Sequence, residues 1–237
     1  MKNGGNKLCA FISYQTSDKQ IAGKMKDILS IYNIDSFLAH EDIDVSEEWR
    51  EEILKYLKKS SIFICILSKN YLESSYCMQE SGIAVIKNMT IISLSLDGTT
   101  PPGFISKYQS KKIDPVRLTI HDIIPGLMKM EKNERIKLLI DIIGDSKSYR
   151  EAERNYEYIL PDLDELNDKQ AEDLLDKVLY NGQINGAHKC FSDYIPRTIK
   201  EYGYLLTKGQ YNRLKEHYKL MGAENLLPRY PAQIEST

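Results

Sequence analysis

The chain has 237 residues, of which 42% are hydrophobic and 28% are charged, and its formal net charge is -2. A chain of this length can form one large domain or two smaller ones, each with a buried core. Because proteins that bind nucleic acid or anionic membranes carry an excess of basic residues, the near-neutral balance argues against both kinds of partner.

The cysteines indicate a reducing compartment. Cys9, Cys65, Cys77 and Cys190 form no CxxC pair, and three of them lie in apolar segments. This distribution is typical of reduced thiols in a cytosol and not of a disulfide framework or a zinc site. The first residues lack the apolar segment of a signal peptide, and no stretch approaches the roughly 18 apolar residues of a membrane span. We therefore expect a cytoplasmic protein without membrane association.

In the first hundred residues, short apolar runs alternate with amphipathic patterns. The runs at 8–14, 34–40, 61–68 and 89–96 are rich in strand-forming residues, and the third is apolar almost throughout, as in a central parallel strand. After each of the first three runs, apolar residues recur at the spacing of an amphipathic helix. The last of these three helices is expected from about Tyr76 to Lys87. Such alternation predicts right-handed βαβ crossovers and a doubly wound α/β sheet.

Beyond Pro102 the alternation weakens. We expect a short edge strand within residues 107–116 and a last helix at 135–143 that packs on the sheet. The polar segment 144–148 is the predicted linker, and the patterns after it are helical and rich in tyrosine. The predicted organisation is an α/β domain at 1–143, a linker at 144–148 and a smaller all-α region at 149–237.

The expected sheet places a ligand site near Glu80. In an open parallel sheet, ligands bind beyond the carboxyl ends of the strands, where the strand order reverses. With the order 2-1-3-4-5 this point lies beside Ser13-Tyr14-Gln15 and residues 68–76. Glu80 then lies early in the helix that leaves the crevice, one turn after Tyr76 on the same face. Because its neighbours are small and apolar, we expect Glu80 to face a pocket and desolvation to raise its pKa.

Four segments, in this order, resemble TIR (Toll/interleukin-1 receptor) domains of the bacterial, NAD-consuming type. They are AFISYQTSD, FLAHEDIDVSEEWREEI, SSIFICILSKNYLESSYCMQE and TIISLSLDG. The resemblance covers about the first 105 residues well and about 140 loosely. It implies a flavodoxin-like TIR domain with a central parallel sheet, followed by the helical region.

The resemblance also implies the roles of individual residues. Glu80, four residues after the aromatic Tyr76, corresponds to the catalytic carboxylate of NAD glycohydrolases, and Trp49 to the aromatic that lines the nicotinamide pocket. The segment Ser13-Tyr14-Gln15 corresponds to the one that helps hold the ribose and phosphates. Two departures stand out: Tyr76 replaces the commoner Trp, and Gln15 stands where several relatives carry Arg, which leaves a phosphate contact there open.

The expected reaction is cleavage of the nicotinamide–ribose bond of NAD, by an NAD glycohydrolase or ADP-ribosyl cyclase. Nicotinamide is already cationic in NAD and leaves without protonation, so one carboxylate suffices where ordinary glycosidases use two. We expect Glu80 to bind the ribose hydroxyls and stabilise the oxocarbenium-like charge, with Trp49 and Tyr76 as apolar walls. NAD is thus a substrate, and no cofactor is expected. The residues do not distinguish ADP-ribose from a cyclic product.

The resemblance further implies a setting for this chemistry. It suggests prokaryotic anti-phage defence, in which the enzyme depletes NAD or makes a cyclic ADP-ribose type signal, as TIR proteins of Thoeris-like systems do. It also implies self-association through TIR–TIR contacts, in which the loop Glu41 to Ser46 completes a neighbour's site. An effector or sensor protein is a candidate partner for the helical region.

Other interpretations stay open. A non-catalytic TIR adaptor would act by recruiting other TIR proteins, and a flavodoxin-like nucleoside deoxyribosyltransferase also uses a crevice Glu. Glu80 is also compatible with an exposed or salt-bridged helix position. Trp49 lies in phase with Ile53 and Leu57 and is compatible with a pure core role. No metal site is expected, because the acidic loop EDID lacks the EF-hand pattern and His188 and Cys190 lack a second ligand pair at zinc spacing.

Overall fold

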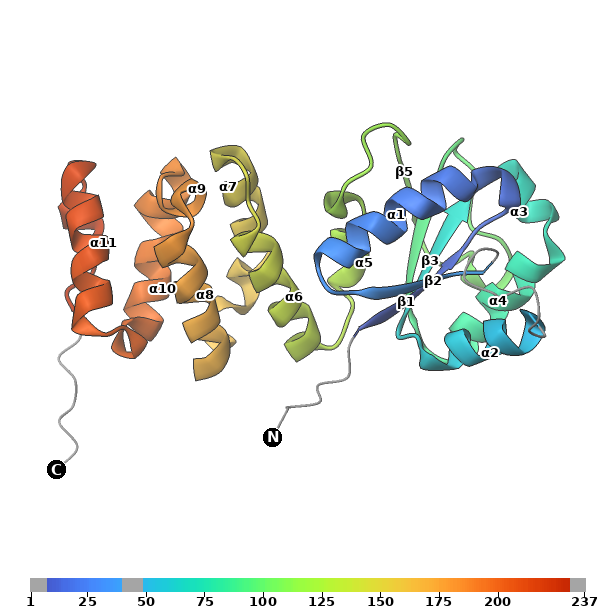
Figure 1. Ribbon diagram of the computed structural model, residues 1–237, viewed down its shortest axis with the longest axis horizontal. Helices are drawn as coiled ribbons and strands as arrows, with labels where there is room; N and C mark the ends of the chain where they lie inside the picture. The colour runs from blue at the N-terminus through green and yellow to red at the C-terminus, as the bar shows by residue number, and fades with distance from the viewer. Residues whose placement is uncertain (1–7, 40–48, 231–237) are drawn as a thin grey trace, which may run out of the picture. The chain divides into compact units, whose positions relative to one another are not determined.

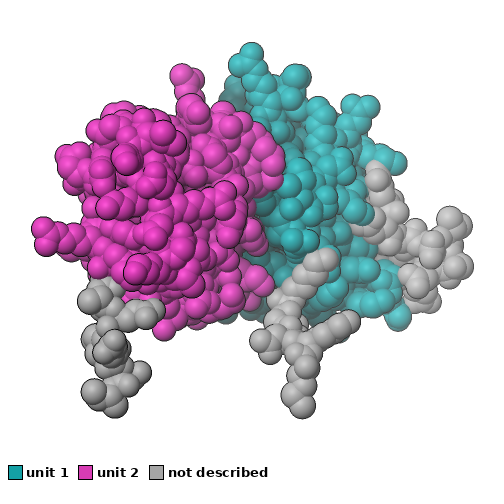
Figure 2. Space-filling model, turned by 60° about the vertical axis from the view of Figure 1, so that its left-hand side comes forward, with its two compact units in different colours: residues 1–130 teal, residues 131–237 magenta. Residues whose placement is uncertain are grey.

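The computed structural model of the chain describes residues 8–39 and 49–230, except for the side chain of Trp49 (Figure 1). The chain divides into two compact units, Met1–Met130 and Glu131–Thr237 (Figure 2). The first unit is α/β, and the second contains helices without strands in its described part.

The first unit is built on a five-stranded parallel sheet (Figure 1). Its strands run in the order β2-β1-β3-β4-β5, and every neighbouring pair is parallel. All residues of β1 and β3 are buried, as expected for central strands covered on both faces. The doubly wound fold predicted from the sequence is confirmed, including the short edge strand. The strands are β1 Cys9–Ser13, β2 Asp35–Leu38, β3 Ile62–Leu67, β4 Thr90–Ser95 and β5 Ser110–Lys112.

A row of aromatic side chains marks one face of this sheet. Phe11 lies beside Phe37 on β2 and Phe63 on β3 in the strand register, and the rings of Phe11 and Phe63 stack with centroids 5.9 Å apart. Ile53 and Ala84 pack into the same cluster. They belong to α2 (Trp49–Lys59) and α4 (Ser75–Ile86), which therefore cover this face (Figure 1).

Ile92 on β4 lies on the opposite face of the sheet. Its neighbour Ile91 belongs to the aromatic cluster, and successive strand residues alternate between faces. The short helix α5 (Ile124–Leu127) approaches Ile92 closely at Gly126. The remaining helices of the unit are α1 (Lys19–Ile31), α3 (Lys69–Glu73) and the 3-10 turns η1 (Thr16–Asp18), η2 (Gly103–Ile105) and η3 (Ile120–Asp122).

The second unit is all helical and has its own core. Among its buried aromatic residues are Tyr156, Tyr194, Tyr211 and Tyr218, which confirms the tyrosine-rich core predicted from the sequence. No helix within residues 8–39 or 49–230 is both long and apolar enough to cross a membrane. The α-helices are α6 Lys132–Gly144, α7 Tyr149–Glu157, α8 Asp168–Tyr180, α9 Gly182–Asn185, α10 Ile195–Tyr202 and α11 Lys208–Leu220; η4 (Leu160–Glu165), η5 (Cys190–Tyr194, a π-helix), η6 (Gly203–Leu205) and η7 (Glu224–Leu226) complete the unit.

The boundary between the units corrects the predicted domains 1–143 and 149–237. It falls after Met130, so α6 belongs to the second unit, where Ile136, Ile140 and Ile143 join the core. The predicted linker 144–148 lies inside this unit, because its Ser146 is buried and accepts a 2.9 Å hydrogen bond from Asn155 Nδ2. Helical periodicity shows that one face of α6 is buried but does not identify what buries it.

Close packing of α5 on the sheet gives a stability prediction. A Cβ atom at Gly126 would lie 2.6 Å from Ile92 Cγ1, and this β-branched side chain on a buried strand has little room to move. We expect Gly126→Ala to lower the free energy of unfolding by about 1–3 kcal/mol. Urea unfolding followed by the fluorescence of Trp49, the single tryptophan, measures this change.

Gly23→Ala on α1 is the matched control, because a Cβ there meets no atom within 4 Å. Its expected effect is the opposite, a gain of about 0.5–1 kcal/mol from higher helix propensity. Equal effects of the two substitutions would contradict the close approach of α5 to β4.

Candidate active site

Two serine caps fix the helices that follow β3. The Ser68 hydroxyl accepts a hydrogen bond from the Tyr71 backbone N–H at 3.2 Å and begins α3. The Ser74 hydroxyl accepts one from the Cys77 N–H at 3.3 Å and begins α4. Such caps satisfy amide groups that have no partner within the helix. They set the starting points of two helices at the carboxyl end of β3, where the strand order reverses.

Glu80 on α4 points toward the end of β1. Its carboxylate oxygen Oε2 accepts a 2.6 Å hydrogen bond from Ser13 Oγ, although the two residues are 67 positions apart in the chain. The Tyr71 hydroxyl lies 3.1 Å from Ser13 Oγ and 3.4 Å from the carbonyl oxygen of Cys77. Ser13, Tyr71 and Cys77 are almost fully buried, and Glu80 is only 4% exposed. A connected polar group thus lies in an apolar interior.

Burial changes the acid–base properties of Glu80. Desolvation raises the pKa of its carboxyl to about 7, and the hydrogen bond from Ser13 opposes this rise because it stabilises the anion. Burial also raises the pKa of Cys77 to about 11 and that of Cys65 to about 12, so both remain neutral, weakly nucleophilic thiols. Within this buried group, Glu80 is the residue that changes charge near neutral pH.

Glu80 lines a cavity of about 360 Å³ between α2 and α4. Besides Glu80, its polar lining residues are Arg50, Tyr76 and Gln79, and the rest of the wall is aliphatic. A pocket with mainly apolar walls and a few polar groups suits a flat organic ring attached to polar groups. We refer to it below as the Glu80 cavity. Its aliphatic residues are Ile53, Leu54, Leu57 and Ile83.

A second hollow lies at the carboxyl ends of β1 and β3. It measures about 370 Å³, and Tyr76 lines it as well as the Glu80 cavity. Its other lining side chains are polar or acidic, and among the described residues that line it there is no cation. They are Gln15, Asn70, Glu73, Ser74 and Ser75.

The residues predicted at the first strand have separate positions. Ser13 is fully buried and is not among the residues that line either hollow, but its hydroxyl contacts Glu80, so its predicted contact with substrate stays a prediction. Tyr14 directly follows β1, is also fully buried, and lines neither the Glu80 cavity nor the second hollow. Gln15 lines the second hollow, where its Oε1 accepts a 2.6 Å hydrogen bond from the Ser17 N–H.

The other predicted residues lie on α2 and α4. Tyr76 and Glu80 are brought together at the Glu80 cavity, as the sequence pattern indicates. Trp49 is the first residue of α2, but its side chain lies outside the described residues. The loop Glu41 to Ser46, expected to take part in self-association, also lies outside them.

Sequence reasoning missed two residues of this region. Tyr71 lies in a segment that reads as a polar loop, yet it forms part of the short helix α3 and is fully buried. Arg50 lines the Glu80 cavity. The sequence indicates this position, because Ile53, Leu54 and Leu57 follow Arg50 after three, four and seven residues. At this spacing a charged residue occupies the first position of an apolar helix face.

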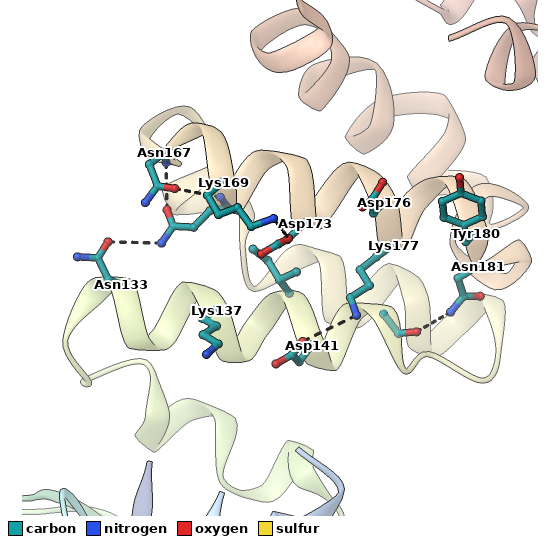
Figure 3. A pocket seen from close by; sticks show the side chains of 13 residues that line it. Asn133, Lys137, Asp141, Asn167, Lys169, Asp173, Asp176, Lys177, Tyr180 and Asn181 are labelled. Carbon is teal, nitrogen blue, oxygen red and sulfur yellow. Dashed lines mark hydrogen bonds and ion pairs between the residues drawn. The ribbon is translucent and has the colours of Figure 1, made fainter. Parts of the chain in front are cut away.

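A wider hollow of about 820 Å³ lies in the second unit, between α6 and α8 (Figure 3). Four of its charged side chains form ion pairs: Lys169 with Asp173 at 2.9 Å, and Lys177 with Asp141 at 3.8 Å. None of the charged residues that line it is buried. It therefore lacks the desolvated ionisable group that distinguishes the Glu80 cavity.

A known protein family matches most of the first unit. A family model, TIR domain, matches residues 10–135, which include β2 to β5, all of β1 except Cys9, and the residues Ser13, Tyr76 and Glu80. Among solved structures, the TIR domain of the Toll-related receptor TRR-2 from Hydra magnipapillata is similar, with 18% sequence identity and a TM-score of 0.39. The similarity covers 49% of this chain and 88% of that chain. No curated protein matches the sequence.

Burial of Glu80 gives a pH-dependent stability prediction. The carboxyl has a pKa of about 7 when folded and 4.5 as its ordinary value, so the folded state resists ionisation and loses stability as pH rises from 4.5 to 7. The loss amounts to about 3 kcal/mol above pH 7. We expect Glu80→Gln to remove this loss. The free energy of unfolding of the variant, relative to that of wild type, then rises by about 3 kcal/mol between pH 4 and pH 8.

Urea unfolding at pH 4, 6 and 8, followed by tryptophan fluorescence, tests this expectation. Glu51→Gln, which removes an exposed carboxylate from α2, is the matched control. A difference between Glu80→Gln and wild type that does not change with pH would rule out the buried, raised-pKa carboxyl.

The hydrogen bond from Ser13 predicts a shift in the same titration. Ser13→Ala removes a donor that stabilises the ionised form, so the pKa of Glu80 is expected to rise above about 7. Carbon-13 NMR of the glutamate side-chain carboxyls, with Glu80 assigned by its loss in Glu80→Gln, measures the change. An unchanged or lower pKa would show that Ser13 does not donate to Glu80.

Proposed function

Because the chain belongs to the TIR domain family, which includes NAD-cleaving enzymes and non-catalytic adaptors, we propose that it is an NAD nucleosidase that uses Glu80. One observation carries this proposal. A carboxylate that is 4% exposed, and whose pKa burial raises to about 7, lies at the wall of a cavity of about 360 Å³. Strongly shifted carboxyls in clefts are typical of catalytic acids and bases.

The reaction breaks the bond between ribose C1′ and the pyridinium nitrogen of NAD. The bonding electrons go to that nitrogen, so nicotinamide leaves as a neutral molecule and positive charge develops on the ribose. An ionised Glu80 stabilises this charge, and its effect is large because the surrounding apolar residues exclude water. Hydrogen bonds from the ribose hydroxyls to the carboxylate orient the sugar. The neutral product departs without a general acid.

The second half of the reaction consumes the ribosyl cation. A water molecule that attacks C1′ forms the new C–O bond, and its surplus proton goes to Glu80, whose pKa of about 7 suits a base at neutral pH. The products are then nicotinamide, ADP-ribose and a proton. If a nitrogen of the substrate's own adenine attacks instead, the product is a cyclic ADP-ribose.

The adaptor function is the principal alternative. Its protein-binding surfaces would gain nothing from a buried carboxylate, which costs stability above its pKa. The Glu80 cavity and the serine that bonds to Glu80 therefore favour the enzyme. A deoxyribosyltransferase would use the same carboxylate on free deoxynucleosides, and a substrate comparison distinguishes the two.

The biological setting is part of the proposal and is supported by the resemblance of the sequence. We propose a hydrolase or cyclase that acts in prokaryotic anti-phage signalling, by depletion of NAD or by release of a cyclic ADP-ribose type signal. Self-association through TIR–TIR contacts is proposed as its active arrangement. The helical unit, Glu131–Thr237, is the proposed binding region for an effector or sensor protein.

The first test is incubation of concentrated protein with NAD. We expect wild type to release nicotinamide at a rate that rises with pH through about 7, because the ionised form of Glu80 is the active one. Glu80→Gln is expected to release nicotinamide at least 100-fold more slowly, because removal of one charge-stabilising group lowers a rate by about this factor. Chromatography of the products resolves nicotinamide, ADP-ribose and cyclic forms.

Glu51→Gln serves again as the control and is expected to retain the wild-type rate. Equal NAD cleavage by wild type and Glu80→Gln would overturn the assignment of Glu80. Turnover of free deoxynucleosides without turnover of NAD would select the deoxyribosyltransferase.

A further inference from the structure

Tyr71 is a buried ionisable residue beside the candidate site that the proposed reaction does not use. Its side chain is fully buried, and desolvation holds the pKa of its hydroxyl well above the ordinary range, so the hydroxyl keeps its hydrogen. Its backbone is fixed by Ser68, which accepts a hydrogen bond from the Tyr71 N–H and donates one of 2.6 Å to Asp18 Oδ2. The Tyr71 hydroxyl therefore has a fixed place in the interior.

Three contacts join Glu80 to this hydroxyl and beyond it. Glu80 Oε2 lies 2.6 Å from Ser13 Oγ, which lies 3.1 Å from Tyr71 Oη, which lies 3.4 Å from the carbonyl oxygen of Cys77. We refer to these four groups as the hydroxyl chain. Each hydroxyl has one hydrogen, and the carbonyl oxygen only accepts. The number of hydrogens in the hydroxyl chain therefore depends on the protonation of Glu80.

When Glu80 is ionised, two hydrogens serve three contacts. The Ser13 hydrogen lies toward the carboxylate, because hydrogen bonds to an ionised acceptor are the stronger ones. The Tyr71 hydrogen then lies toward Ser13 Oγ, its nearer acceptor. The Cys77 carbonyl keeps a donor without it, since Ser81 Oγ donates to this oxygen at 2.9 Å. Both hydroxyl dipoles thus point at the negative charge.

When Glu80 is neutral, three hydrogens serve the same three contacts. Glu80 can donate to Ser13, Ser13 to Tyr71, and Tyr71 to the carbonyl oxygen of Cys77. Each hydroxyl keeps its own hydrogen and turns about its C–O bond, so no proton is transferred within the hydroxyl chain. The proton on Glu80 comes from water, through the cavity that this residue lines.

The other titratable groups around Glu80 stay in one charge state near neutral pH. Burial raises the pKa of Cys65 to about 12 and that of Cys77 to about 11. Arg50 and Tyr76 line the cavity with Glu80, and an arginine is permanently charged whereas a tyrosine is uncharged at neutral pH. A response of the hydroxyl chain to pH near 7 therefore reports on Glu80.

We infer that Tyr71 is a positioning residue that directs the Ser13 hydroxyl toward ionised Glu80, and that the donor direction along the hydroxyl chain reverses when Glu80 takes up a proton. Successive hydrogen bonds that point the same way polarise and strengthen one another. The bearing of this device on catalysis rests on the proposed function, in which ionised Glu80 stabilises the ribosyl cation. Tyr71 then helps to set the pH at which the enzyme is active.

Tyr71→Phe tests the positioning role, because it removes the hydroxyl and keeps the ring. We expect the pKa of the Glu80 carboxyl to rise by about 0.5–1, since the ionised form loses a charge-assisted arrangement and the neutral form loses weaker bonds. Carbon-13 NMR of the glutamate carboxyls measures this pKa without turnover. An unchanged or lower pKa in Tyr71→Phe would overturn the inference.

Tyr156→Phe is the matched control. It also removes a fully buried tyrosine hydroxyl, one that lies 2.8 Å from Thr198 Oγ1 in the core of the second unit. It is expected to lower the free energy of unfolding as Tyr71→Phe does, but to leave the pKa of Glu80 unchanged. Equal shifts of this pKa in the two variants would reduce the effect to general destabilisation and contradict the positioning role.

The reversal has a direct test that keeps Tyr71 in place. Carbon-13 NMR of the tyrosine Cζ atoms reports on the hydrogen bonding of each hydroxyl, and we expect the Tyr71 signal of wild type to follow the titration of Glu80 near pH 7. Ser13→Ala interrupts the hydroxyl chain and is expected to abolish this response. A Tyr71 signal that is constant from pH 5 to pH 9 in wild type, or that responds equally in Ser13→Ala, would exclude the reversal.

The pH profile of nicotinamide release separates this inference from the proposed function. We expect the midpoint of the profile to move upward in Tyr71→Phe, with kcat at high pH within about threefold of wild type, because the charge of Glu80 is retained. If wild type cleaves no NAD but the pKa of Glu80 rises in Tyr71→Phe, the proposed function fails and the positioning role stands. If kcat falls equally at every pH and this pKa is unchanged, Tyr71 is only structural and the inference fails.

Discussion

The hydrogen bond between Ser13 and Glu80 joins the end of β1 to the interior of α4, and the candidate site depends on it. It gives a buried carboxylate a partner, without which desolvation would favour the neutral form more strongly. It also fixes the direction of Glu80, because Ser13 is held in a fully buried strand and contacts the Tyr71 hydroxyl. The aromatic row behind it holds α2 and α4 against the same sheet face, so the cavity between these helices is part of the packing of the core.

Much of the first unit was predictable from the sequence because its strands are short, apolar and regularly spaced. A run such as residues 61–68 has one stable environment, a strand covered on both faces, and its helices follow from periodicity. The position of Glu80 was predictable for a related reason: a carboxylate among small and apolar residues on a helix beside the crevice has few other places to lie.

The errors and omissions have equally specific causes. Tyr14 follows Ser13 in the chain, but it is fully buried and lines neither hollow, and the motif alone does not show this. Tyr71 was missed because the polar residues around it suggested a loop, while its own ring is buried. The helix α6 was assigned to the sheet because its apolar face fits any apolar surface, and only the contacts show that Ile136, Ile140 and Ile143 belong to the helical core.

The burial of Glu80 has a consequence for how charge is handled during a catalytic cycle. A carboxyl with a pKa of about 7 is roughly half ionised in the empty site at neutral pH. In the proposed reaction, the pyridinium cation of the arriving substrate favours the ionised form, so binding would expel the remaining proton to solvent. When neutral nicotinamide leaves, the positive charge passes to the ribose, and only after a nucleophile has attacked C1′ does the attraction end and the carboxyl regain its affinity for a proton. The substrate would thus activate the group that cleaves it, and the unoccupied site would avoid a full buried charge.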